Sequence, residues 1–352
     1  MTHGVLAPQR STFTSRKTVN GSRGTVTPWV RPADWLALTT PSSSDQRMVG
    51  LAAVFESNSN FVTVRASSAF KVDWGDGAGW QLFAANTTAE KNLQWADYDA
   101  GTLCSRGYRQ AIVTVEPQSG NLTGLELRYR HSNAAASSNT SSVWLDLRIA
   151  CAGTPTISGP SSQWFPRMLE SVTVASNTAS ASYLFNGCTG LRSVSVATTG
   201  CVSFTNMFRG CSALRDVPQF DTSSGTDFSS MFNGCTTLQR PPTYGTSSGS
   251  NFNGMFANCP ALQVVPALNV SAGTDLGSMF NGCSALQWSD VYGGTRGISY
   301  ATANLSAAAL NNIYTNLGTA SGAQTITVTG NWGTATDTPS IATAKGWTVA
   351  GS

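Results

Sequence analysis

The chain has few charged residues and almost no histidine. Charged side chains make up 11% of its 352 residues, compared with roughly 25% in an ordinary soluble domain. Only His3 and His131 could supply an imidazole. The chain therefore has very few candidates for the histidine of a Ser-His or Cys-His catalytic pair. Phosphate-binding loops and strand-linked G-x-G-x-x-G motifs are also missing. The sequence therefore predicts a protein that is not an enzyme and binds no cofactor, with one alternative left open, a pair of acidic residues brought together by folding as in glycosidases.

Long apolar segments are missing as well. No apolar run approaches the roughly 18 residues of a membrane span, and the first residues lack the apolar core of a secretory signal. We therefore expect no membrane insertion and no export by a signal peptide. The net charge of +3 is too small to predict a nucleic-acid-binding surface. Gly, Ser, Thr and Asn are abundant instead, which is typical of β-rich extracellular and virion proteins.

The first 45 residues differ from the rest in charge. Residues 1–47 contain six basic and two acidic side chains, an excess of four positive charges. A basic segment rich in Ser, Thr and Gly cannot bury enough apolar surface to fold alone. We expect residues 1–45 to form an extended arm that orders on a partner, and the alternative is a disordered tail. The expected anchoring residues are Arg10, Arg16, Lys17, Arg23, Trp29 and Trp35.

Residues 46–155 contain short apolar or alternating segments bounded by turn-forming residues. Their spacing predicts an antiparallel β-sandwich. The predicted strands cover residues 48–55, 61–65, 70–74, 111–115, 122–129 and 143–149.

One turn in this region carries a recognisable motif. Asp73, Trp74, Gly75, Asp76 and Gly77 form a W-G-D-G signature that resembles PKD-like immunoglobulin sandwiches. The two aspartates could suggest calcium, but two carboxylates fall short of the six to eight oxygens, roughly, that calcium prefers. We interpret them as residues that hydrogen-bond the backbone of the turn, with no metal.

The C-terminal half contains an internal repeat of 23 or 24 residues with the pattern F-x-x-M-F-x-G-C-x-x-L-x-x-V-P. A Phe lies three residues before each repeated Cys and a Leu three residues after it. The repeat ladder consists of Phe185, Cys188, Leu191, Phe208, Cys211, Leu214, Phe232, Cys235, Leu238, Phe256, Cys259, Leu262, Phe280, Cys283 and Leu286. Such a period is typical of a solenoid.

Each repeat is expected to form one coil of that solenoid. The residue before the Cys is Gly, or Asn at position 258, which suits the left-handed end of a short helical turn. The alternating residues after the Leu predict a short strand. No coil can bury its apolar face alone, so neighbouring coils must stack. We expect a mainly β protein with a sandwich over residues 46–155, a solenoid over 156–293 and an α/β cap over 294–352.

The repeat residues resemble the BspA-like leucine-rich repeats of bacterial surface proteins and phage structural proteins. The resemblance covers about residues 165–350 and includes the ending from Ile341 to Val349. The cap is also predicted from its own residues. Ser306 suits the N-cap of a helix with Leu310, Ile313 and Tyr314 on one face, and residues 325–329 alternate as a strand.

The eight cysteines contain no C-x-x-C pair, so a zinc site is not expected. Stacked ladder residues lie about 5 Å apart with parallel Cβ vectors, which suits a disulfide poorly. The ladder cysteines are therefore predicted to be buried free thiols. For Cys104 and Cys151, outside the ladder, pairing is left open.

The expected arm, sandwich and repeat solenoid are typical of a surface adhesin, but the sequence shows no export signal. This combination suits a phage protein, which is made in the cytoplasm of the host bacterium and released by lysis. We therefore expect a bacteriophage virion protein, either a tail-fibre, tail-associated or head-decorating component. Its arm would bind other virion proteins, its solenoid a host-surface glycan or protein, and it would form a homo-oligomer in the particle. The alternative is a bacterial cell-surface leucine-rich-repeat adhesin.

Overall fold

A computed structural model of the chain describes residues 29–57, 59–127, 131–132, 143–158 and 166–352. The chain divides into two compact units, Met1–Val30 and Arg31–Ser352. Predicted arm residues Arg10, Arg16, Lys17 and Arg23 lie outside the described residues. The second unit is a mainly β structure with a β-solenoid over about residues 146–350.

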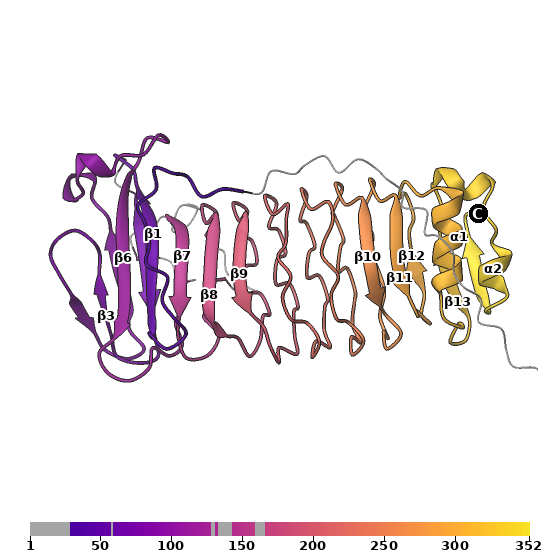
Figure 1. The fold of residues 1–352 in the computed structure, drawn as a ribbon, viewed down its shortest axis with the longest axis horizontal. Coiled ribbons are helices and arrows are strands. Elements are labelled where there is room, and N and C mark those ends of the chain that lie inside the picture. Colours follow the sequence, from indigo (N-terminus) through magenta and orange to yellow (C-terminus); the bar gives the residue numbers. More distant parts are fainter. Residues whose placement is uncertain (1–28, 58, 128–130, 133–142, 159–165) are drawn as a thin grey trace, which may run out of the picture. The chain divides into compact units, whose positions relative to one another are not determined.

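A seven-stranded mixed sheet begins this unit, in the order β4-β3-β6-β1-β7-β8-β9 (Figure 1). The neighbouring pairs from β4 to β7 are antiparallel, and β7, β8 and β9 are parallel. The strands are β4 (Gln81–Phe83), β3 (Phe70–Asp73), β6 (Arg109–Pro117), β1 (Arg47–Val54), β7 (Trp144–Ala150), β8 (Ser171–Asn177) and β9 (Ser193–Ala197). The sheet therefore runs without a break from the N-terminal region into the first coils.

The expected immunoglobulin-type sandwich over residues 46–155 is not confirmed. Most of the predicted strands exist, but a second sheet in the described part of this region has only β2 (Phe61–Arg65) and β5 (Thr88–Asn92). Two short 3-10 helices follow, η1 (Trp95–Asp97) and η2 (Ala100–Thr102). The open edge of β7 is taken by β8, with Leu147 opposite Val172 and Ile149 opposite Val174. This pairing aligns the buried residues of both strands and extends one sheet.

The repeat coils are joined by two interleaved series of backbone hydrogen bonds. Alternate N–H groups donate to the next coil, as from Phe208 N to the Met231 carbonyl (2.9 Å) and from Phe232 N to the Met255 carbonyl (2.8 Å). The intervening groups close turns within a coil, as from Cys235 N to the Phe232 carbonyl (3.0 Å). Every coil therefore satisfies its buried backbone groups through its neighbour.

The turn before each ladder cysteine has two left-handed residues. The predicted one is confirmed at Gly187, Gly210, Gly234, Asn258 and Gly282, whose φ angles are 57–79°. A second lies five residues before each cysteine, at Tyr183, Asn206, Ser230, Gly254 and Ser278. The predicted short helical turn is absent from these segments, because a left-handed residue at that place prevents a right-handed helix from forming.

The predicted strand is present in some coils and absent from others. Besides β8 and β9, strands occur at β10 (Val264–Asn269) and β11 (Trp288–Tyr292), which pair in parallel. Residues 201–263 contain no assigned strand. Pro218, Pro241 and Pro242 lie at the expected strand positions of these coils and cannot donate a ladder hydrogen bond. Pro266, equivalent to Pro218 and Pro242, lies within β10, where the pairing with β11 shifts register between Val265 and Leu268.

An α/β cap ends the unit. Its sheet has the order β12 (Ile298–Ser299), β13 (Gln324–Thr327), β14 (Trp347–Ala350). Helix α1 (Ala307–Asn316) begins as predicted, with the Ser306 side chain accepting from Ala309 N at 3.2 Å. The short elements η3 (Trp332–Ala335) and α2 (Ser340–Thr343) complete the cap. Lys345 Nζ donates to the carbonyls of Tyr314 (3.1 Å) and Leu317 (2.7 Å), which satisfies the C-terminal end of α1.

Candidate binding surface

The inward positions of the coils form continuous rows of stacked side chains. The ladder phenylalanines stack at centroid separations of 5.4 Å for Phe185–Phe208, 5.5 Å for Phe208–Phe232 and Phe232–Phe256, and 5.9 Å for Phe256–Phe280. Tyr300 of the cap ends this row. Every residue of the repeat ladder is at most 1% exposed. The ladder is therefore core and offers nothing to a ligand.

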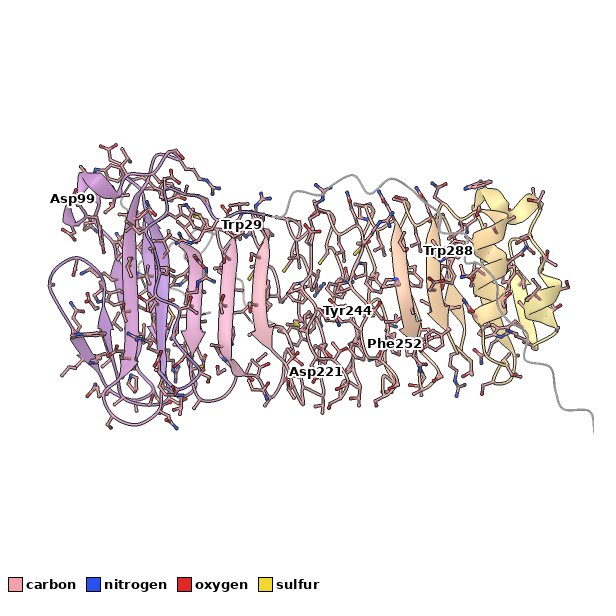
Figure 2. All side chains as sticks on the ribbon, in the orientation of Figure 1. Trp29, Asp99, Asp221, Tyr244, Phe252 and Trp288 are labelled. Carbon is pink, nitrogen blue, oxygen red and sulfur yellow. The ribbon has the colours of Figure 1, made fainter. Side chains whose placement is uncertain are left out.

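A second aromatic row runs beside the first. Phe204, Phe228 and Phe252 stack at 5.4 Å, and Phe220 and Tyr244 fill the space between the rows. Figure 2 shows Tyr244 and Phe252 among the side chains of the middle coils. This row was not predicted, although its members also recur at 24-residue spacing.

The eight cysteines are free and buried, so Cys104 and Cys151 do not pair. Each ladder thiol after the first donates to the carbonyl of the phenylalanine in the preceding coil, as from Cys211 Sγ to Phe185 (3.1 Å) and from Cys235 Sγ to Phe208 (3.1 Å). Burial raises the pKa of the Cys283 thiol to about 12 and that of Cys151 to about 11. Thiols with a raised pKa are poor nucleophiles and poor metal ligands.

The outward positions carry hydroxyl, amide and carboxylate groups that mainly bond their own backbone. Eight residues before a ladder cysteine, a short polar side chain accepts from the N–H two residues on, as Asp227 does from Ser229 N (2.9 Å) and Asn251 from Asn253 N (3.1 Å). The exposed loop residue Asp221 does the same for Ser223 N (2.9 Å). These turns fix the backbone and leave the remaining polar atoms exposed for a partner.

A row of buried threonines lies under the loops and was not identified from the sequence. Thr198, Thr222 and Thr246 are each 2% exposed. Their hydroxyls donate to the carbonyls of Asp221, Gly245 and Asn269 in the next coil, at 2.6, 3.0 and 2.8 Å respectively. The recurrence of Thr at 24-residue spacing could have predicted this row. Its hydrogen bonds hold the loops of neighbouring coils in register.

The W-G-D-G turn follows β3, and both of its aspartates hydrogen-bond the backbone of the turn. Asp73 accepts from Gly75 N (2.9 Å) and Asp76 from Ala78 N (3.1 Å), as the turn interpretation predicts. Asp76 also forms an ion pair with Lys91. Burial raises the pKa of Asp76, but the Lys91 ammonium and the Ala78 amide outweigh it and lower the pKa overall. No group of three potential metal ligands occurs among the described residues.

The other two residues of the motif hold the turn against the sheet. Trp74 is fully buried and donates from Nε1 to Gln81 Oε1 at 3.0 Å. Gly75 has φ of +74°, and a Cβ there would lie 2.4 Å from the Ile112 carbonyl oxygen. Gly77 also has positive φ, but its surroundings are open. The motif therefore serves packing and turn formation.

The two tryptophans of the expected arm differ in their location. Trp35 belongs to the folded unit, where it is 4% exposed and donates to the Tyr108 hydroxyl at 3.0 Å. Its ring lies between the guanidinium groups of Arg31 and Arg106, at 5.4 and 5.5 Å. Trp29 belongs to the first unit. Trp35 is thus part of the body, and a separate arm would end at Val30 rather than at residue 45.

The comparisons with known proteins give one match. Residues 178–291, about one third of the chain, are similar to the family described as Mycoplasma protein of unknown function, DUF285. No curated protein matches, and no solved structure matches. No helix in the described part of the chain has the length and hydrophobicity to span a bilayer.

Proposed function

We propose that the chain is a non-catalytic structural and adhesion protein of a bacteriophage particle. Residues 1–30 attach it to other virion proteins, and the solenoid presents its outward rows to a glycan or protein on the host surface. The observation that carries the proposal is the division of every coil into two faces. The inward face is filled by stacked Phe, Leu and Cys side chains, and the outward face presents short polar side chains on a rigid backbone.

A repeat surface of this kind suits binding because its geometry is set by stacking. Adjacent coils lie about 4.8 Å apart, and each contributes a similar set of outward groups. A long partner can therefore contact several coils at once. The resemblance of the repeats to BspA-like proteins and the W-G-D-G turn of PKD-like domains favour the same kind of surface role.

A bacterial cell-surface adhesin is the second candidate function. The similarity of residues 178–291 to a Mycoplasma family favours it, because members of that family occur in bacteria themselves. In this case the first unit would connect the solenoid to the cell envelope instead of to a virion.

The two candidates are separated by locating the protein. Antibodies against the solenoid should label purified phage particles under the first proposal and the envelope of the producing cell under the second. The purified chain should adsorb to host cells and leave the chain length of the host polysaccharide unchanged. Depolymerisation of that polysaccharide by the isolated chain would refute a non-catalytic role.

A further inference from the structure

A pocket of about 230 Å³ lies where the seven-stranded sheet meets the first repeat coil. Its base is formed by three neighbouring segments that contain Leu145, Glu170 and Arg192. They are joined by backbone hydrogen bonds from Glu170 N to the Leu145 carbonyl (2.9 Å) and from Arg192 N to the Glu170 carbonyl (2.9 Å). The pocket is lined by Arg106, Tyr108, Leu145, Arg167, Met168, Glu170, Gly190 and Arg192. It thus combines residues from the loop before β6, from β7 and from the first coils.

Gly190 lets the first coil pack closely against the chain that carries Arg167 at the edge of this pocket. The equivalent position, two residues after each ladder cysteine, holds Ala213, Thr237, Ala261 and Ala285 in the later coils. A Cβ at Gly190 would lie 2.5 Å from the Arg167 carbonyl oxygen. The first coil therefore has no side chain where the other coils have one, and the chain around Arg167 passes close by.

The pocket has an excess of positive charge at its rim. Three guanidinium groups face one carboxylate, that of Glu170, which forms ion pairs with Arg106 and, at 3.8 Å, with Arg192. The side chains of Arg106 and Arg192 remain 44% and 49% exposed. Arg167 is exposed and has no ion pair among the described residues. Two positive charges are left for a ligand.

The walls below this rim are apolar. Leu145 and Tyr108 are 1% and 3% exposed, and Met168 is half-buried beside them. A small apolar wall under a cationic rim suits a ligand with one non-polar face and one anionic group. The volume is below the range of roughly 300–1,000 Å³ for drug-sized ligands, which matches a single sugar ring.

We propose that this pocket binds the carboxylate of an acidic sugar in a host-surface glycan. Arg167 and Arg192 donate paired hydrogen bonds to the carboxylate, and the sugar ring packs its C–H face against Met168, the apolar lining residue with exposed surface. Arg215 occupies the position equivalent to Arg192 in the next coil and extends the cationic edge along the glycan. The inference rests on the proposed adhesive function and adds the chemical class of its ligand.

The test is calorimetric titration of the full chain with a tetrasaccharide that contains two glucuronic acid residues. The same tetrasaccharide with its carboxylates reduced to alcohols, inorganic sulfate and inorganic phosphate are titrated in parallel. The binding variant is Arg167→Gln with Arg192→Gln. The matched control is Arg240→Gln, because Arg240 is an exposed arginine of a later coil.

We expect the acidic tetrasaccharide to bind wild type and Arg240→Gln alike, and the binding variant at least about tenfold more weakly, the effect of losing a charge-assisted contact. Binding should weaken in high salt and be absent with the reduced sugar. If the double variant melts early, Arg167→Gln alone is used, since its side chain has no ion pair among the described residues.

Equal affinity of the binding variant and Arg240→Gln would overturn the proposal, and so would sulfate or phosphate binding as tightly as the sugar acid. Adsorption to host cells separates this failure from failure of the proposed function. A wild-type chain that adsorbs to cells but does not bind the sugar acid refutes only the pocket. A chain that does not adsorb at all refutes the adhesive role.

Discussion

Substitution of Phe232 tests whether the stacked row is the energetic core of the solenoid. Its ring is fully buried and stacks at 5.5 Å on both Phe208 and Phe256, with Tyr244 at 6.0 Å. Truncation of a buried Phe costs about 3–5 kcal/mol in total, a range that already includes the loss of aromatic contacts worth about 0.5–1.5 kcal/mol each. Because the coils on both sides lose contacts, we expect Phe232→Ala to cost about 4–5 kcal/mol.

The assay is thermal unfolding followed by calorimetry and circular dichroism. With an unfolding entropy of about 2.1 cal/mol/K per residue, a loss of this size lowers the Tm of the second unit, Arg31–Ser352, by about 6–7 °C. The control is Ser247→Ala, in an exposed loop, which should change stability by less than about 0.5 kcal/mol. Small and equal shifts for both variants would refute the assignment of the ladder to the core. A solenoid can also unfold in parts, and the part that melts first should then contain position 232.

Four further predictions follow from other observations. The Tyr244 hydroxyl is buried and has no hydrogen-bond partner among the described residues, and the preceding coil has Phe220 at the equivalent position. Tyr244→Phe should therefore be neutral or stabilising by up to about 1 kcal/mol in denaturant unfolding; a clear loss of stability would show that the hydroxyl is bonded. The native thiols should resist alkylation at pH 8 until the protein unfolds, and rapid labelling of the folded chain would contradict their burial. Because burial raises the pKa of Cys283 from its usual 9 to about 12, the unfolded chain loses this proton first, and stability should fall as the pH rises from about 9 to about 12; a Cys283→Ala variant should lose less over this range. Deletion of residues 1–30 should leave the melting transition intact and abolish incorporation into particles, and full incorporation of the truncated chain would exclude the first unit as the anchor.

Local sequence signals were enough for much of the repeat structure. The 24-residue period predicted stacking, because apolar residues at fixed spacing can only be buried against copies of themselves. The glycine or asparagine before each ladder cysteine predicted a left-handed residue, and Ser306 predicted the start of α1. These features depend on one or two residues and their immediate neighbours.

Other features depend on which segments meet in space. The same short strands could have closed a sandwich, and the pairing of β7 with β8 instead extended one sheet into the solenoid. Trp35 was counted with the arm because it lies in the basic N-terminal segment, but its partners Arg106 and Tyr108 lie about 70 residues away. No local pattern identifies such partners.

The sequence by itself therefore determined the solenoid, its register and the inward row of Phe, Cys and Leu, since these repeat along the chain and each copy supports the same interpretation. Only the tertiary structure decided the continuity of the sheet and the grouping of Arg106, Arg167 and Arg192 around Glu170. Those contacts occur once, between segments far apart in the chain, so neither periodicity nor spacing could reveal them. The physical reason is that a repeat encodes contacts between equivalent positions, whereas a unique junction depends on the packing of the whole unit.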